Sequence, residues 1–253
     1  MFPESVKLCA QPEQGLDSKA VVRPTALELF RGVADEDRRR IARLSSERRY
    51  PRGAAIFSEG DPGDSMFIVV EGLVKLVSVS DRGGETILHI LKPGEMFGEL
   101  LFSEERRAFD AIASTEVLVT VIPRKSFEEI MASVPAIARN FIRLLSRRLT
   151  RVEQGFAGFG HTRSYQRLGK VLLQLGREHG VETSKGTVIS LRLTHEDLAK
   201  LIGTTRETVT TQVNRFRRMG LLKREGRHFI LNTELLVKFV SPADMEPEHA
   251  AGR

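Results

Sequence analysis

The sequence has one cysteine, Cys9, no tryptophan and two tyrosines among its 253 residues. A single cysteine excludes an intrachain disulfide, and it cannot hold an iron–sulfur cluster, which needs several thiolate ligands. Long apolar runs are also absent: the longest plain run, MFIVV at 66–70, is far shorter than the roughly 20 residues of a membrane-spanning helix. The N-terminus, MFPESVKLCAQPEQG, lacks the apolar stretch of a signal peptide. We therefore expect a cytoplasmic, globular protein that does not engage a membrane.

Signals for a metal site or a catalytic centre are equally sparse. The six histidines lie far apart, so a cupin-like metalloenzyme would lack its paired ligands, and we predict no metal site. His89 lies in the strand-like run TILHIL, where histidine is more often a strand residue than a haem ligand. GDS at 63–65 is similar to a hydrolase serine motif, but the surrounding DPGD is more typical of a turn. We predict that the protein is not an enzyme.

Positive charge is concentrated in one part of the chain. The whole sequence has a net charge of +6, but residues 134–230 contain 19 Lys and Arg against 7 Asp and Glu, which gives this stretch +12 and leaves −6 for the remainder. A basic block of this kind favours a polyanionic partner such as nucleic acid. A solvated surface that only aids solubility is the alternative.

Glycine punctuates the first half of the chain. Eight of the 21 glycines fall between Gly53 and Gly98, where they separate short apolar runs such as AAIF, MFIVV, VKLVSV and TILHIL. Short runs bounded by turn residues are typical of β-strands. We predict one antiparallel jelly roll over about residues 50–123, preceded by a helix from Ala26 to about Ser46.

After Pro123 the apolar period becomes that of a helix. Steps of four and three residues separate the members of a heptad seam, which are Ala138, Ile142, Leu145, Leu149, Val152, Phe156 and Phe159. We predict a dimerisation helix. The alternative is a core helix whose flank, Ile137, Phe141 and Leu144, covers the β-domain.

The chain beyond the seam alternates between breaks and short elements. Glycines at 155, 158 and 160 each weaken the helix by roughly 1 kcal/mol relative to alanine, and they predict a hinge. The run SYQRLGKVLLQLGREHG predicts an amphipathic helix that stops near Gly180. Residues 183–193 are strand-like, and the tail after residue 240 predicts disorder.

Two capping signals predict a helix-turn-helix. Thr194 and Asp197 form one capping box, and Thr204 and Glu207 form another, with Gly203 at the turn between the two helices. Next, LLKREGRHFIL predicts a β-hairpin, which would make the motif winged.

The second helix of this motif has an unusual composition. Seven of the ten positions 204–213 are β-branched, which lowers helix propensity. Short side chains keep a helix narrow, and their hydroxyls and methyls suit contacts to phosphates and to thymine. We interpret this helix as one that enters a DNA groove. Gln212 stands at a position of the helix-turn-helix that is usually apolar. Val213 beside it is expected to compensate by packing against the first helix.

Three stretches resemble one known family. TTRETV with the hairpin, EGDPGDSMFIVVEGLVKL and KPGEMFGELLF are similar to the CRP/FNR family of bacterial transcription regulators, over roughly residues 25–240. The resemblance implies an α+β fold with a β jelly-roll sensor domain, a long dimerisation helix and a C-terminal winged helix-turn-helix domain. The expected parts are a disordered arm (1–24), the sensor domain (25–133), the dimerisation helix and hinge (134–160), the winged domain (161–240) and a disordered tail (241–253).

The resemblance places two base-reading residues on the second helix. Arg206 can pair with guanine and Glu207 can accept from cytosine. The alternative is that Glu207 only caps the helix and Arg206 only grips phosphate. Thr211 stands where the best-known member has a second reading arginine, so the half-site should differ. Further DNA-contact candidates are Thr194, Thr204, Thr205, Thr208, Thr210, Arg215, Arg227 and His228.

The resemblance also implies an effector site in the roll. In cyclic-nucleotide-binding members a Gly-Glu pair begins a short helix and an arginine pairs with the phosphate. The matching residues and their neighbours here are Gly98, Glu99, Leu100, Arg107 or Arg106, and Ala108, with Val152 and Glu153 at the adenine-contacting positions. The chain departs from the pattern at Leu101, normally a small residue, at Ala108, normally a hydroxyl residue, and in the segment from Glu99 to the arginine, which is short. Cyclic AMP, another small molecule, or a vestigial roll that binds nothing all remain open.

The expected partners follow from two-fold symmetry. A homodimer would place two recognition helices in successive major grooves, so the operator should be a pseudo-palindrome with half-sites about 34 Å apart. RNA polymerase is the further expected partner. A cyclic-nucleotide-binding regulatory subunit of another protein is a rival class, but the winged motif argues against it.

Overall fold

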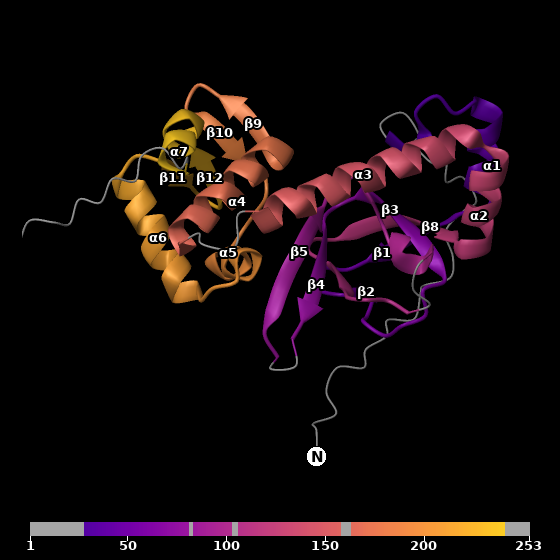
Figure 1. The fold of residues 1–253 in the computed structure, drawn as a ribbon, viewed down its shortest axis with the longest axis horizontal. Coiled ribbons are helices and arrows are strands. Elements are labelled where there is room, and N and C mark those ends of the chain that lie inside the picture. Colours follow the sequence, from indigo (N-terminus) through magenta and orange to yellow (C-terminus); the bar gives the residue numbers. More distant parts are fainter. Residues whose placement is uncertain (1–27, 81–82, 103–105, 158–162, 241–253) are drawn as a thin grey trace, which may run out of the picture. The chain divides into compact units, whose positions relative to one another are not determined.

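The computed structural model of the chain describes residues 28–80, 83–102, 106–157 and 163–240 (Figure 1). The chain divides into two compact units, Met1–Val152 and Glu153–Arg253. The predicted arm (1–24) and tail (241–253) lie outside the described residues.

The first unit contains the predicted roll. Two antiparallel four-stranded sheets form it, with strand orders β1-β8-β3-β6 and β2-β7-β4-β5. Their strands are β1 (Ser46–Tyr50), β2 (Ala55–Phe57), β3 (Ser65–Glu71), β4 (Val74–Val79), β5 (Glu85–Leu91), β6 (Met96–Phe97), β7 (Asp110–Ala113) and β8 (Val117–Pro123). The jelly roll predicted from glycine-punctuated apolar runs is confirmed.

The middle of strand β3, residues 66–70, is a continuous apolar run because both faces of the strand are covered. Phe67 and Val69 point into the roll, where they pack with residues of the second sheet. Met66 and Ile68 point to the other side, where they join a cluster built by the helices. A strand buried on both faces gives a continuous apolar run rather than an alternating one, which explains MFIVV.

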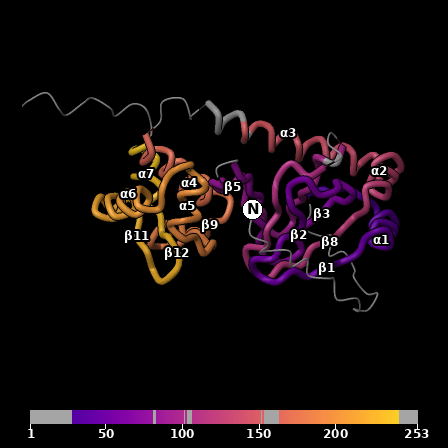
Figure 2. The backbone as a smooth tube through the Cα atoms, turned by 90° about the horizontal axis from the view of Figure 1, so that it is seen from below, coloured from indigo at the N-terminus to yellow at the C-terminus, as the bar shows by residue number. Residues whose placement is uncertain are grey.

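Helices of the first unit cover that outer side of β3. They are the 3-10 turn η2 (Glu28–Phe30), α1 (Asp35–Arg43), α2 (Arg124–Ser133) and α3 (Pro135–Ala157). Ile41, Phe127 and Phe141, from three of the helices, share one buried cluster. Figure 2 shows α1 and α2 side by side at one end of the roll.

The predicted single helix from Ala26 to Ser46 is wrong within the described residues. Gly32 has a φ of +72°, a left-handed conformation that separates η2 from α1. Ser46 already belongs to β1, which pairs with β8. The sequence SERRY conceals this strand because it lies at a sheet edge and four of its five residues are exposed.

Helix α3 has two different apolar faces. One face, the predicted flank, packs on the roll, and the other, the predicted seam, is largely exposed. Ile137 and Phe141 are buried against the roll side, and Leu144 packs partly on the same cluster. The seam is different: Ile142 is 63%, Leu149 59% and Val152 49% exposed. Ala138 and Leu145 are half-buried. The side chain of Phe156 and all of Phe159 lie outside the described residues, as do two of the three hinge glycines.

The second unit is a small helical domain with a four-stranded sheet. Its elements are α4 (Ser164–His179), β9 (Gly180–Thr183), β10 (Gly186–Ile189), α5 (His195–Ile202), α6 (Arg206–Arg218), β11 (Leu222–Glu225), β12 (His228–Leu231) and α7 (Thr233–Val240). The sheet order is β11-β12-β10-β9. The predicted stop of α4 at Gly180 and the predicted hairpin at 222–231 are confirmed.

Helix α7 completes the core of this unit. A Cβ at Gly169 of α4 would lie 2.3 Å from Val240 Cγ1, so this glycine allows the two helices to approach closely. Phe216 of α6 meets Phe239 of α7 edge-on, with ring centroids 5.3 Å apart. No helix was predicted from the sequence for residues 233–240.

Within the described residues, no helix combines the length and the apolar character needed to cross a membrane. The same residues contain no cluster of three or more His, Cys, Asp or Glu side chains that could hold a metal ion.

Candidate functional site

The first helix of the motif begins and ends as its sequence dictates. Thr194 is the N-cap of α5: its Oγ1 accepts from the Asp197 backbone N–H at 3.0 Å, and Asp197 Oδ2 accepts from the Thr194 N–H at 2.9 Å. Gly203 ends the helix with φ 63° and ψ 54°, the left-handed C-cap conformation that glycine adopts without steric cost. The predicted capping box and turn glycine are confirmed.

Helix α6 begins one residue later than the second predicted capping box requires. Its N-cap is Thr205, whose Oγ1 accepts from the Thr208 N–H at 3.3 Å. The Thr204 N–H instead donates to Ala199 O and so belongs to the end of α5. The Thr204–Glu207 box is therefore wrong. Arg206 and Glu207 are the first two residues of α6, and both are exposed.

The apolar face of α6 locks it onto α5. Val209, Val213 and Phe216 are each at most 2% exposed. Gln212 lies beside them, and its Oε1 is buried with no hydrogen-bond partner among the described residues. Val213 therefore supplies the packing that Gln212 does not, as expected from the sequence.

The threonine hydroxyls of α6 are mostly engaged within the motif. Thr210 Oγ1 donates to Arg206 O at 2.9 Å and lies 2.8 Å from His195 Nδ1 of α5. Thr211 Oγ1 donates to Glu207 O at 3.0 Å. Such bonds to the preceding turn satisfy a hydroxyl without a partner outside the helix. Thr205 and Thr211 are nonetheless exposed, whereas Thr208 and Thr210 are half-buried.

The remaining candidates differ in how they are held. Arg227 is exposed at the tip of the wing, next to Gly226. His228 is half-buried, and its Nδ1 lies 3.1 Å from Ile189 O, which fixes the wing to β10. The Arg215 guanidinium lies 5.3 Å from the ring centroid of Tyr165. Thr194, the N-cap of α5, is exposed.

The second unit also contains a basic hollow that no sequence motif indicates. A space of about 650 Å³ lies between the end of α6 and strand β11. Its lining includes Arg217, Arg218, Lys223 and Arg224, together with Asn214. The excess of positive charge over residues 134–230 was the only sequence signal for this cluster.

His195 joins the two helices of the motif. It stacks near Phe229, with ring centroids 6.5 Å apart, and its Nε2 is buried without a partner among the described residues. Burial lowers the pKa of His195 below its usual 6.5, and the charges of Arg224 and Arg206 lower it further. The folded state therefore favours the neutral form of the His195 imidazole.

We expect this histidine to make the fold acid-sensitive. Because the folded-state pKa lies below the unfolded value, the unfolded chain takes up the proton first, and the free energy of unfolding falls as the pH drops below about 6.5. Thermal unfolding of the full chain at about pH 7.5 and about pH 5.5 measures the effect. His195→Gln should lose less Tm on acidification than the wild type. An equal loss in both proteins would contradict the assignment.

In the roll, Arg107 rather than Arg106 faces the Gly98–Glu99 pair. The Arg107 guanidinium is buried, donating from Nη1 to Gly98 O at 3.3 Å and from Nη2 to Ser65 O at 2.8 Å. Arg106 is exposed, and its Nη1 donates to Gly60 O at 2.7 Å. Gly98 has a φ of +85°, and a Cβ there would lie 2.9 Å from Arg107 Nη1. Arg107, and not Arg106, is therefore the arginine that lies beside Gly98.

Aromatic rings hold Arg107 in the roll. Its guanidinium carbon lies 4.4 Å from the ring centroid of Phe57 and 5.4 Å from that of Phe67. Burial lowers the pKa of Arg107, and the carboxylates of Asp64, Asp61 and Glu99 oppose that shift. Arg107 remains charged despite its burial, because a guanidinium group does not lose its proton near neutral pH.

Glu99 connects the roll to α3. It begins the short turn η3 (Glu99–Phe102), and its Oε1 accepts from Arg148 Nη1 of α3. Among the described residues, Glu99 Oε2 and Arg107 Nε are buried without a hydrogen-bond partner. Ala108 is exposed, and Leu100 is half-buried. Val152 is an exposed residue of α3, and the Glu153 side chain lies outside the described residues.

A β-roll with a buried Gly-Glu-Arg group, a long helix and a winged helix-turn-helix together define a class of DNA-binding proteins with a sensor domain. Residues 47–134 match the cyclic nucleotide-binding domain family, and residues 166–239 match the Crp-like helix-turn-helix domain family. The chain belongs to the CRP/FNR family of transcription regulators, which are not enzymes.

Three relatives support this assignment. The CRP-like cAMP-activated global transcriptional regulator of Mycobacterium tuberculosis strain H37Rv is 32% identical over 81% of this chain and 92% of its own length. The cyclic AMP receptor protein of Thermus thermophilus is 31% identical over 77% of this chain and 88% of its own length. A solved CRP/FNR family regulator, also from Thermus thermophilus, superposes with a TM-score of 0.61 at 27% identity, over 77% of this chain and 98% of that chain.

Proposed function

We propose that the chain acts as a homodimer on pseudo-palindromic operator DNA, and that a small molecule in the roll sets its DNA affinity. The contact between Glu99 and Arg148 carries this proposal. It ties the effector-site carboxylate to α3, the helix whose seam residues Ile142 and Leu149 are exposed in the single chain. A ligand that changes this contact would bias α3 and, through the dimer, the spacing of the two recognition helices.

A cyclic nucleotide is the effector class that we propose. Glu99 Oε2 is a buried acceptor without a partner among the described residues, which suits a ribose hydroxyl donor. Arg107 is a buried cation beside Gly98, which suits a phosphate anion. The names of the relatives from Mycobacterium tuberculosis and Thermus thermophilus both refer to cyclic AMP. Ala108, which replaces a hydroxyl residue of the family pattern, argues for altered contacts to the ligand.

At the DNA we propose that Arg206 and Glu207 read bases and that the wing grips the backbone. Arg206 and Glu207 are exposed in the first turn of α6, the end of a recognition helix that meets base edges. The exposed Arg227 and the basic hollow beside β11 suit contacts to phosphates. We propose further that regulation follows from contact with, or obstruction of, RNA polymerase.

Footprinting tests the proposal as a whole. An operator is first selected from a random duplex library with the purified protein, and its protection is then measured with and without cyclic AMP or cyclic GMP. We expect a protected pseudo-palindrome whose affinity rises with one of the nucleotides and falls steeply with salt. Protection that no nucleotide alters would favour the runner-up, a ligand-independent regulator with a vestigial roll.

Replacing Glu99 tests the effector half separately. Glu99→Gln keeps the size of the side chain but replaces the charged acceptor proposed for the ribose hydroxyl, and the partner of Arg148, with a neutral amide. The nucleotide Kd should therefore rise by about tenfold or more, as for a lost charge-assisted hydrogen bond. Isothermal titration calorimetry measures this Kd. The matched control is Glu116→Gln, which removes an exposed carboxylate from the same roll. Equal nucleotide affinity in both variants would refute the role of Glu99.

A further inference from the structure

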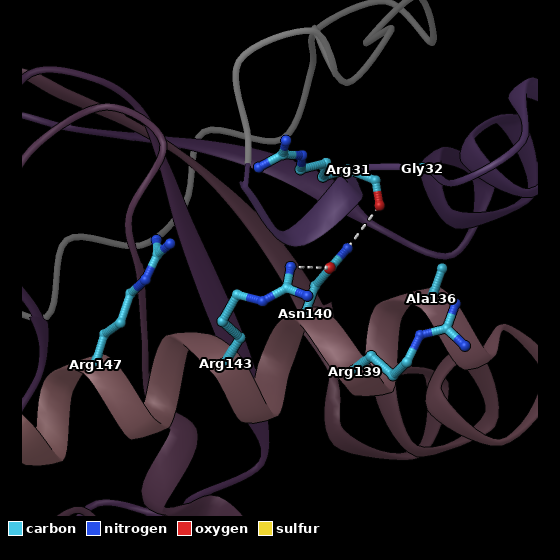
Figure 3. Close-up of a pocket in the computed structure, with 7 residues that line it drawn as sticks. All are labelled: Arg31, Gly32, Ala136, Arg139, Asn140, Arg143 and Arg147. Atoms are coloured by element: carbon cyan, nitrogen blue, oxygen red, sulfur yellow. Dashed lines mark hydrogen bonds between the residues drawn. The ribbon is translucent and has the colours of Figure 1, made fainter.

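A second basic hollow lies in the first unit, away from the roll interior (Figure 3). It has a volume of about 440 Å³, within the range of small-molecule sites. Arg139, Arg143 and Arg147 recur every four residues of α3 and therefore share one face of the helix. Arg31 closes the opposite side, from the segment that follows η2. Four arginines thus line one concave space.

The two sides of this hollow are fixed to each other. Asn140 of α3 is 6% exposed, and its Nδ2 donates to Leu29 O at 2.9 Å and to Arg31 O at 2.8 Å. Its Oδ1 accepts from Arg143 Nη1 at 3.2 Å. The amide is therefore satisfied on both sides and acts as a rigid floor. Pre-organised walls reduce the conformational entropy that the protein loses when a ligand binds.

The hollow carries more positive charge than its surroundings neutralise. Arg147 is paired with Glu28 at 2.5 Å. By contrast, the side chains of Arg31 and Arg139 form no hydrogen bond or ion pair with any other residue in the described part of the chain. The lining residues include four arginines and no acidic side chain, and Arg147 alone among them is paired with a carboxylate in the described residues, so the hollow favours a multiply charged anion.

We propose that this hollow binds a small ligand that carries several phosphate groups. Guanidinium groups hold phosphate oxygens through paired N–H donors, and four of them in one concave space match a chain of linked phosphates better than a single anion. A flat basic patch would instead suit a protein surface or a duplex. Counted at about 100° per residue, Arg143 lies roughly a quarter turn from Ile142, so the hollow is on a different face of α3 from the seam. The site is also separate from Glu99 and Arg107 in the roll.

The test uses inorganic triphosphate as the probe, titrated into the full chain at fixed ionic strength by calorimetry. We expect one site in the first unit to bind triphosphate more tightly than phosphate or sulfate. A second arm uses ATP and GTP: a lower Kd than for triphosphate would identify a nucleotide, and an equal Kd would identify the phosphate chain alone as the recognised group. Binding should persist at saturating cyclic AMP, which separates this site from the proposed effector site.

Two variants make the result specific. Arg139→Gln removes one cation whose side chain forms no hydrogen bond or ion pair within the described residues. Arg139→Gln/Arg143→Gln removes two cations from the hollow. We expect the triphosphate Kd to rise by about tenfold or more in the double variant and by less in the single one. The control Arg48→Gln/Arg52→Gln removes the same charge from exposed positions elsewhere on the roll. Equal weakening in the control, or unchanged binding in both hollow variants with Tm preserved, would overturn the proposal.

Discussion

Arg206→Ala should weaken binding to the selected operator by about 1 to 3 kcal/mol and should erase most of the preference for that operator over scrambled DNA. Arg206 is the first residue of α6, and it is exposed. An arginine fork in that place can make two hydrogen bonds to guanine O6 and N7, which no other base pair presents in the same pattern. Truncation removes both bonds and leaves the fold of the motif unchanged, because Arg206 contributes nothing to the buried face of the helix.

The comparison that isolates base reading is Arg227→Ala. Arg227 is exposed at the tip of the wing, in the turn between β11 and β12, and one strand separates it from the recognition helix in sequence. We expect this variant to lose affinity about equally for operator and scrambled DNA, because a phosphate contact carries no sequence information. Gel-shift titrations of both variants on both duplexes measure the difference. If Arg206→Ala also lost affinity equally on the two duplexes, Arg206 would be a phosphate contact and the base-reading proposal would fail.

The order of elements was predictable because local signals in this chain agree with its tertiary structure. Glycine spacing indicated the roll, and the capping box at Thr194 with the turn glycine Gly203 indicated the helix-turn-helix. The errors occurred where local signals are weak. The edge strand Ser46–Tyr50 is polar because it is exposed, so no alternation reveals it. Thr204 and Thr205 are both good caps, and only the fold decides which of them starts α6.

The sites were harder to predict than the fold because their members come from distant parts of the sequence. Arg106 and Arg107 are neighbours, and only the three-dimensional position of Gly98 decides which of them turns inward. The same holds for Asn140, whose hydrogen bond to Leu29 O spans 111 residues. No periodicity or motif within one segment can predict such contacts, because each segment supplies only one half of the pair.

The seam of α3 leads to the largest expected effect on function. Leu149→Glu should convert the protein from dimer to monomer and should weaken binding to a two-half-site operator by about a hundredfold or more, because the second half-site contact then loses its high effective concentration. Leu149 is 59% exposed in the single chain, so its replacement removes little from the core of the monomer. A glutamate in an apolar seam, in contrast, would bury an unpaired charge in each protomer.

Thr150→Glu is the matched control, because it adds the same charge at the next residue of the same helix. Thr150 is exposed and lies about 100° around α3 from Leu149, off the line of Ile142 and Val152. Sedimentation velocity should find a dimer for the control and a monomer for Leu149→Glu, and affinity for a single half-site should be similar in both. The difference between the two variants would show that the loss of the dimer comes from the disrupted apolar seam and not from the added charge. A dimer in both variants would place the interface elsewhere and would remove the link between α3 and the spacing of the recognition helices.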